Sequence, residues 1–325
     1  MNKITVETVY GEAAIKGVEK TIISGLKIFQ TYDWLSVSGN AVSAVICYDE
    51  KKRILAYLPL VESTKFKVKG FHIPPYTPYF GPVILEADVF HKGQIVESIL
   101  KPIKNSKHLD FVIPSGDEDI VSYSRLGFSI EASQTHIIEK EGAYSLSSIH
   151  GSKRRYLKKL LDMADSGRIN IKYGRNCIED LLYLNNETEK RAGFKGNKEV
   201  LKELVNRFGS DENILVIYSE KGNPLSGAFF PGDTQFAYHL INASLRDEDN
   251  ILDKANLLST YKAVSQTLSR GKSFDFEGSN IPGVAAFYRM MGGKPVINLR
   301  MQKSGSFLYA LLRAGIKIKK ERYDF

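Results

Sequence analysis

The stretch FDFEGSNIPGVAAFYRMMGG, residues 274–293, places two carboxylates just before a Gly-Ser turn and an expected helix. Asp275 and Glu277 stand two positions apart, so on one strand both side chains point to the same face. Two carboxylates this close resist joint ionisation, and the one with the raised pKa suits a general base. The alternative is structural: Asp275 would then bond backbone groups at the start of the next helix.

Three further side chains add groups that handle protons or grip a substrate. Tyr238 and His239 lie inside TQFAYHLINAS, residues 234–244, which we expect to be one strand. An unperturbed histidine has a pKa near ~6.5, so His239 suits a base or a group that binds a carboxylate. Tyr288, in the expected helix, would donate a proton or hydrogen bond to a leaving group. The alternatives are a satisfied core histidine and a tyrosine packed between helix and sheet.

Positive charge is concentrated in the second half of the chain. Of 45 Lys+Arg and 37 Asp+Glu, residues 1–140 hold 16 of each, so the later residues carry the whole net charge of +8. Lys153, Arg154 and Arg155 stand near the start of an expected helix, where the macrodipole disfavours cations. We expect an anionic partner there, either the phosphates of a nucleotide- or lipid-linked acceptor or tRNA. A solvated face that keeps the protein soluble is the alternative.

A second basic region, from about residue 303, ends the chain. It combines apolar residues with cations: Phe307, Leu308, Leu311, Leu312, Ile316, Lys317, Lys319, Lys320 and Arg322. This pattern suits either peripheral contact with an anionic membrane surface or docking on the protein with a solvated basic end.

Hydrophobic periodicity predicts an α/β fold with a mixed sheet in the second half. The expected order is helix 148–166, strand 169–173, helices 177–192 and 197–208, strands 213–219, 224–230 and 234–244, helix 253–269, strand 274–276, helix 282–291 and strand 295–301. Turn signals between the three middle strands favour an antiparallel meander.

The first half repeats the later part of this order. An expected hairpin at 41–63 is followed by the extended PPYTPYFGPVI with Tyr76 and Tyr79, then by a helix and a strand–helix–strand ending at 109–139. That ending, Asp110-Phe111 through a glycine to Tyr123-Ser124-Arg125, matches the order around Asp275 and Tyr288. The repeat predicts two domains, residues 1–143 and 144–325, each with a mostly antiparallel sheet flanked by helices.

Several linked motifs resemble a known family. The element order is similar to that of the GNAT acyltransferase fold, and HGSKRRYLKKLLDMADSG, AYHLINASLRDEDNILDKANLLSTYKAVSQTLSRGKSFDFEGS and GVAAFYRMMGGKPV resemble tandem-domain FemAB-like transferases. The resemblance covers most of 144–301; before that it depends on PPYTPYFGPV and the duplicated ending. It implies a cytoplasmic bacterial acyltransferase or aminoacyltransferase that acts on an amine of a peptidoglycan, polysaccharide or other envelope precursor.

The resemblance also implies the cofactors, and together with the residue chemistry above it gives the expected site. It implies no metal and no tightly bound cofactor, with acyl-CoA or aminoacyl-tRNA as co-substrate. The expected catalytic residues are Glu277, Tyr288, His239 and Asp275. The expected substrate-binding residues are Lys153, Arg154, Arg155, Tyr238, Arg289, Tyr76 and Tyr79.

Two departures from the family pattern leave the donor open. Peptide-bridge-forming members carry lysine at the position of Tyr288, and Arg289 stands about 100° further round the helix. The tyrosine is similar to the GNAT residue that protonates a departing thiolate, which favours CoA. Against this, LRDEDNILD after the central strand has four acids and no glycine to cradle a pyrophosphate.

Other classes are disfavoured by the sequence. The first residues do not resemble a signal peptide, and no run approaches the ~18 apolar residues that would span a bilayer. Cys47 and Cys177 lie far apart, which argues against a disulfide framework or zinc site, and no phosphate loop, H-E-x-x-H or nucleophile elbow is present. The remaining alternative is a non-catalytic RNA- or anion-binding protein built on a duplicated GNAT scaffold.

Overall fold

The computed structural model describes most of the chain. The described residues are 4–65, 67–85, 91–114, 119–245, 251–278 and 281–305, without the side chain of residue 253. The basic segment from about 303 therefore lies almost entirely outside the described residues, and so do residues 246–250 of the acidic loop.

Two compact units make up the structure. Unit 1 contains the described residues up to 133 together with those from 297, and unit 2 contains residues 134–296. Strands β7 (Ser129–Ile138) and β14 (Lys294–Ser304) contribute residues to both. The boundary expected between residues 143 and 144 stays a prediction, and the description below follows the compact units.

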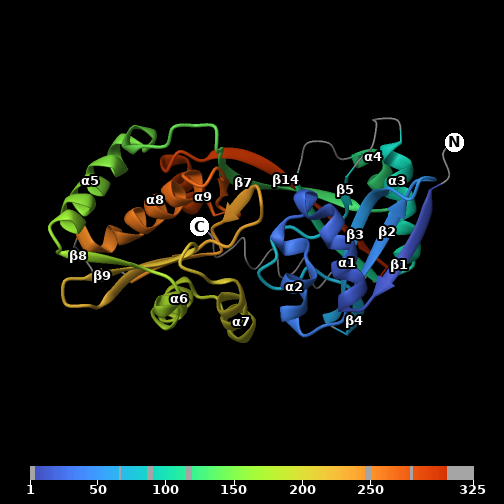
Figure 1. The fold of residues 1–325 in the computed structure, drawn as a ribbon, viewed down its shortest axis with the longest axis horizontal. Helices are drawn as coiled ribbons and strands as arrows, with labels where there is room; N and C mark the ends of the chain where they lie inside the picture. Colours follow the sequence, from blue (N-terminus) through green and yellow to red (C-terminus); the bar gives the residue numbers. More distant parts are fainter. Residues whose placement is uncertain are drawn as a thin grey trace. The chain divides into compact units, whose positions relative to one another are not determined.

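Unit 1 is an α/β unit with one main sheet (Figure 1). Its elements are β1 (Thr5–Tyr10), α1 (Glu12–Ile22), α2 (Tyr32–Leu35), β2 (Val42–Tyr48), β3 (Ile54–Lys65), β4 (Val68–Phe71), β5 (Val83–Ile84), α3 (Lys92–Leu100), β6 (His108–Pro114) and α4 (Ile120–Arg125). The sheet order is β1-β2-β3-β4-β6-β14, with β5 paired to β3. All these pairs are antiparallel except β4 with β6.

The core of unit 1 explains why these residues form strands. Val45, Ile46 and Cys47 in β2 are fully buried in succession, so the strand is covered on both faces. Trp34 and Phe80 are equally enclosed. The hairpin expected at 41–63 is confirmed by the antiparallel pairing of β2 with β3.

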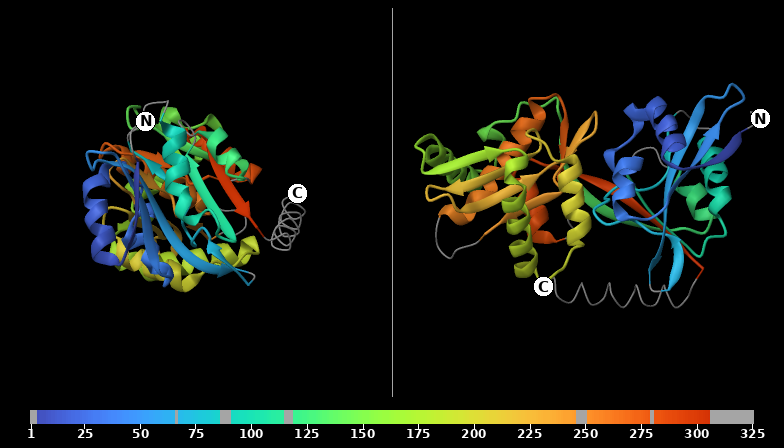
Figure 2. Two further views of the ribbon diagram at one scale, coloured as in Figure 1. Left: turned by 90° about the vertical axis from the view of Figure 1, so that its right-hand side faces the viewer. Right: turned by 60° about the horizontal axis from the view of Figure 1, so that its bottom comes forward.

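Unit 2 has a sheet with helices on both faces (Figures 1 and 2). Its elements are α5 (Gly151–Asp165), β8 (Ile169–Tyr173), α6 (Ile178–Ala192), α7 (Lys198–Phe208), β9 (Ile214–Ser219), β10 (Pro224–Phe229), β11 (Phe236–Tyr238), β12 (Ile241–Ser244), α8 (Ala255–Leu268), β13 (Ser273–Asp275) and α9 (Pro282–Met290). Strands β12-β10-β9-β8 are antiparallel, with α5 and α8 on one face and α6 and α7 on the other. The expected helices of this half and its mixed α/β class are confirmed.

One strand differs from expectation. Residues 234–244 form two strands, β11 and β12, interrupted at His239-Leu240. Strand β11 pairs in parallel with β13 up to Tyr238 and Asp275, whereas β12 pairs with β10. After Asp275, the chain that continues from β13 stays hydrogen-bonded to β7, because the Phe276 N–H donates to the His136 carbonyl at 3.0 Å.

The two parallel strands therefore part where they end. We call this place the fork, defined by His239 on one branch and Phe276-Glu277 on the other. In α/β sheets the space beyond the carboxyl ends of parallel strands, at a switch in strand order, is where ligands bind. The fork lies within unit 2 and holds the residues that the sequence marked for chemistry.

Candidate functional site

Glu277 does not continue the strand that carries Asp275. Strand β13 ends at Asp275, and Glu277 has a left-handed backbone with φ of 60°. The expectation that the two carboxylates share one strand face was wrong, because the chain turns between them. A left-handed conformation is unfavourable for a residue with a Cβ and is concentrated at functional sites.

Gly278 fixes the turn against β7. Its φ is 79°, and a Cβ built there would lie 2.4 Å from the Gln134 carbonyl oxygen. The backbone must therefore approach β7 more closely than any side chain permits. This close approach sets where Glu277 stands.

Asp275 holds the turn from inside. Its side chain is 1% exposed, and its Oδ1 accepts hydrogen bonds from the Thr135 hydroxyl at 2.5 Å and the Glu277 N–H at 2.8 Å. Its backbone carbonyl accepts from the His239 N–H at 2.8 Å. Asp275 therefore has the structural role that the sequence left open, since its side chain bonds a backbone N–H group. That group belongs to the turn and not to the start of the next helix.

The carboxyl group of Glu277 is poorly solvated. Its Oε1 is buried and has no hydrogen-bond partner among the described residues. Burial raises the pKa of Glu277 well above its ordinary value, and the nearby Asp275 charge raises this pKa further. When ionised, such a carboxylate is a stronger base than an exposed one, as a general base requires.

This raised pKa makes stability depend on pH. The protonated Glu277 contributes stability that is fully present below the unfolded-state pKa of about 4.5 and is lost as pH rises through the higher folded-state pKa. Relative to Glu277→Gln, the wild-type free energy of unfolding should fall by up to about 1.4 kcal/mol per pH unit in that window. Urea denaturation of both proteins from pH 4 to 8 measures it, and parallel curves would contradict it.

Aromatic rings line the fork. The Phe276 ring stacks on Tyr288 with centroids 4.5 Å apart and planes at 24°. His239 lies 5.9 Å from Phe276 on one side, and His136 lies 5.9 Å from Tyr288 on the other. These rings therefore form a buried aromatic cluster that carries a few polar atoms at the fork.

Tyr288 remains a phenol throughout the neutral pH range. Burial raises its pKa, and the charges of Glu277 and Asp275 raise it further. The O–H group is therefore a hydrogen-bond donor, and a phenolate is strongly disfavoured. This suits a group that assists a leaving atom.

His239 is neutral, which corrects the assumption of an ordinary histidine pKa. It is 4% exposed, and neither ring nitrogen has a hydrogen-bond partner among the described residues. Burial lowers its pKa to about 3. A neutral imidazole offers one N–H donor and one acceptor at the fork, and it cannot grip a carboxylate as a cation.

Two residues of β7 were missed by the sequence reasoning. Thr135 and His136 are fully buried, and the Nδ1 of His136 lacks a hydrogen-bond partner among the described residues. Burial lowers the His136 pKa, and the Arg289 charge lowers it further. The only signal was QTHIIE inside a strand-like run, and the domain boundary drawn at 143 placed it in the first domain.

The three cations of α5 have different surroundings. Arg154 donates to the carbonyls of Ile149 at 2.8 and 3.1 Å and Ser147 at 3.1 Å, so it closes the loop before the helix. Arg155 is exposed and Lys153 is partly exposed. The start of α5 is bound to the end of α9, because the His150 N–H donates to the Met290 carbonyl at 2.9 Å. Lys153 and Arg155 thus stand next to the helix that carries Tyr288.

The remaining expected substrate-binding residues are dispersed. Tyr238 is fully buried, and its hydroxyl donates to Asp233 at 2.6 Å. Arg289 is exposed on α9. Tyr76 and Tyr79 belong to unit 1, where Lys27 lies 4.5 Å from the buried Tyr79 ring and the Asn298 amide lies 3.4 Å from the Tyr79 hydroxyl. The fork itself combines Asp275, Glu277, His239 and Tyr288.

The described residues were also compared with what a metal site or a membrane-spanning helix requires. They contain no cluster of three His, Cys, Asp or Glu side chains able to hold a metal ion. No helix within the described ranges is both long and apolar enough to cross a bilayer. Cys47 and Cys177 are buried free thiols.

Comparison with known proteins identifies the fold. No family model matches the chain, and no curated protein matches it by sequence. The structure resembles that of FemX, with a TM-score of 0.65 at 11% identity over 90% of this chain and 96% of that one. The chain has a tandem GNAT fold. It also resembles L-PGS from Bacillus licheniformis, with a TM-score of 0.55 at 13% identity over 93% and 94% of the two chains.

A third structure supports the same fold. This is a tandem GNAT protein from the clavulanic acid biosynthesis pathway, with a TM-score of 0.50 at 8% identity over 94% of this chain and 99% of that one. At sequence identities this low, structural similarity establishes the fold alone. The chemistry must therefore be argued from the residues of the site. The tandem arrangement expected from the duplicated ending is confirmed.

Proposed function

We propose that the fork of unit 2 transfers an acyl or aminoacyl group to an amine, with Glu277 as the general base. The observation that carries this proposal is the buried Glu277 Oε1, which has no hydrogen-bond partner among the described residues and sits on a left-handed backbone. Burying such a group without a partner is costly. A substrate that supplies the missing partner accounts for that cost.

Each group at the fork has a role in this reaction. The amine nitrogen attacks the acyl carbon, the new C–N bond forms, and Glu277 accepts the N–H proton. Tyr288 donates a hydrogen bond to the leaving oxygen or sulfur as the old C–O or C–S bond breaks. The proton that Glu277 accepted then passes through water to that leaving atom, which restores the Glu277 carboxylate. No step consumes an oxidant or a reductant.

The donor is an aminoacyl-tRNA or an acyl-CoA, and the acceptor is an amine on an anionic envelope or glycan precursor. Support for an anionic substrate comes from Lys153 and Arg155, which lie near the end of α9 and are not buried. Neither donor needs a tightly bound cofactor. Incubation with each donor and a panel of amines, followed by mass spectrometry of the amide products, tests the proposal.

A second candidate function is supported by the exposed cations of α5. Arg155, Lys158 and Lys159 are all exposed on that helix, as a non-catalytic RNA- or anion-binding surface would require. That function predicts binding without any amide product from either donor.

Replacing Lys153 and Arg155 together by glutamine should weaken tRNA binding and flatten its salt dependence. Each cation that contacts a phosphate contributes roughly 0.7–0.9 to the slope of log affinity against log salt. Fluorescence anisotropy of labelled tRNA over a salt series measures this slope. The control replaces Lys195 and Lys221, which are exposed elsewhere on unit 2, and an equal loss in both pairs would contradict a defined α5 site.

A further inference from the structure

Thr135 is the side chain that anchors Asp275. It is fully buried in β7, and its hydroxyl donates to Asp275 Oδ1 at 2.5 Å. The same oxygen accepts the N–H of Glu277 at 2.8 Å. One carboxylate oxygen therefore links a hydroxyl of β7 to the backbone of the proposed base.

This link bears on a strained conformation. Glu277 has φ of 60°, and a non-glycine residue keeps such a backbone only where its surroundings hold it. Gly278 holds it from one side through its close approach to Gln134. Asp275 holds it from the other side, and Thr135 fixes the orientation of that carboxylate.

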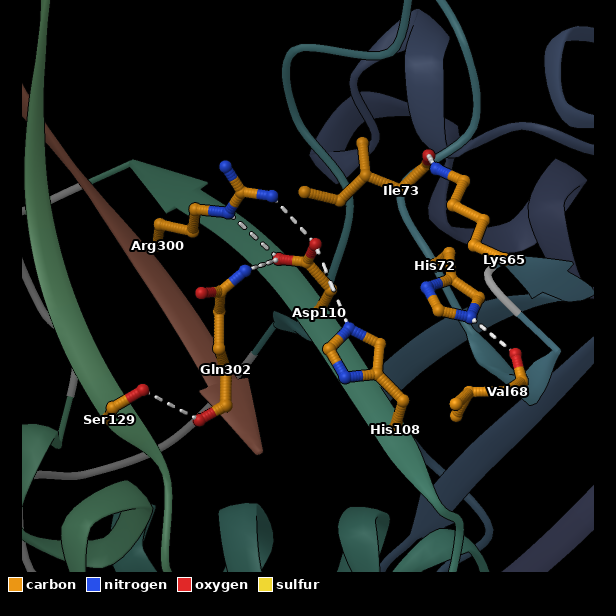
Figure 3. A network of polar contacts seen from close by, with 9 residues as sticks. All are labelled: Lys65, Val68, His72, Ile73, His108, Asp110, Ser129, Arg300 and Gln302. Carbon is orange, nitrogen blue, oxygen red and sulfur yellow. Dashed lines mark hydrogen bonds and ion pairs between the residues drawn. The ribbon is translucent and has the colours of Figure 1, made fainter. Parts of the chain in front are cut away.

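Unit 1 contains the corresponding arrangement (Figure 3). Asp110 on β6 is 4% exposed and accepts a two-pronged hydrogen bond from Arg300 on β14, at 2.9 and 2.7 Å. Gln302 donates to the same carboxylate at 3.0 Å. Burial alone would raise the pKa of Asp110, but the nearby His108 and the hydrogen bonds from Arg300 hold this pKa well below its ordinary value.

The strand registers make the two arrangements equivalent. Gln302 pairs with Asp110, and Arg300 stands two residues before it on β14. Thr135 likewise stands two residues before the β7 residue that pairs with Asp275. The same register position thus supplies a cation in unit 1 and a neutral hydroxyl in unit 2.

That difference matters for Glu277. The charge of Asp275 is one of the causes that raise the pKa of Glu277, after burial. A guanidinium at position 135 would oppose this effect, as opposite charges do at close range. A hydroxyl orients the carboxylate and adds no charge.

We propose that Thr135 is a positioning residue, which fixes the Asp275 carboxylate without adding charge and thereby holds Glu277 at the fork in its left-handed conformation. The inference rests on the proposed function only in that Glu277 is taken to be the general base. The anchoring itself is independent of any substrate, and it is tested without one.

The test is the titration of the Glu277 carboxyl followed by carbon-13 NMR, with its signal assigned by comparison with Glu277→Gln. Thr135→Val removes the donor at nearly constant volume. The turn then relaxes toward solvent, and the Glu277 midpoint should fall by about one pH unit toward its ordinary value. Thr135→Ser keeps the hydroxyl and should retain the wild-type midpoint. An unchanged midpoint in Thr135→Val would overturn the proposal.

Controls separate positioning from folding and from the proposed function. Ser133→Ala removes another β7 hydroxyl, which bonds the Asn298 carbonyl at 3.4 Å, and should leave the midpoint unchanged. If Thr135→Val does not fold, Thr135→Cys, a weaker donor, should give an intermediate midpoint, and a wild-type midpoint there would overturn the proposal. A shifted midpoint in a protein that makes no amide supports Thr135 while the proposed function fails. If Glu277→Gln loses amide formation while Thr135→Val keeps the wild-type midpoint and rate, the Thr135 proposal fails and the proposed function stands.

Discussion

Glu277→Gln is expected to lower the rate of amide formation at least tenfold, which corresponds to about 1.4 kcal/mol of transition-state stabilisation. The amide keeps the size of the side chain but cannot accept the proton of the attacking amine. The variant should be at least as stable as wild type at neutral pH, because it removes a carboxyl whose ionised form is disfavoured by burial and by Asp275.

The measurements are initial rates of product formation and urea denaturation at the same pH. Glu220→Gln is the matched control, since Glu220 is exposed in the turn between β9 and β10, and it should leave both quantities unchanged. A Glu277→Gln protein that unfolds more easily at neutral pH and reacts at the wild-type rate would show that this residue serves the fold.

Gly278→Ala should have the largest effect on stability of the variants considered. A side chain at φ of 79° is strained, and its Cβ would meet the Gln134 carbonyl oxygen at 2.4 Å, which is backbone and cannot rotate away. We expect a loss of roughly 3 kcal/mol or more in the free energy of unfolding. Glu277 is the preceding residue, so transfer activity should fall as well.

Gly271→Ala separates the two causes. Gly271 also has a positive φ, of 70°, but a Cβ there meets nothing within 4 Å. Its loss should be limited to the conformational strain, about 1 kcal/mol. Chemical denaturation of both variants gives the comparison, and equal losses would mean that the close approach of Gly278 to β7 adds nothing.

Much of the fold follows from local patterns in the sequence. Residues 148–166 were expected to be helical, and α5 covers 151–165, because apolar residues recur at helical spacing and a glycine follows. The hairpin of β2 and β3 was equally readable from two apolar runs separated by a short charged turn. Such elements are set by interactions between residues close in the sequence.

The fork could not be predicted from local sequence patterns. FAYHLINAS alternates like one strand, but Tyr238 pairs with β13 whereas Ile241 pairs with β10. The interruption at His239 depends on which distant strands compete for the chain. A local pattern carries no information about that competition.

The site was partly predictable. Asp275, Glu277, His239 and Tyr288 are brought together at the fork, as their place in the chain suggested. The sequence predicted a raised pKa for one of the two carboxylates, but it did not predict that burial is the main cause for Glu277 or that burial lowers the pKa of His239. Thr135 and His136 lie on β7, before the expected domain boundary. Only the tertiary pairing of β7 with β13 brings them to the site.

The most direct test of the account is single-turnover amide formation by wild type and Glu277→Gln, with each donor, over a pH range from 4.5 to 9. A general base works in its ionised form, so the wild-type rate should rise with pH through a midpoint well above the usual range of a glutamate. Glu277→Gln should be at least tenfold slower at the plateau and should lack that midpoint. Identical pH–rate profiles for the two proteins, or no amide from either donor, would contradict the account.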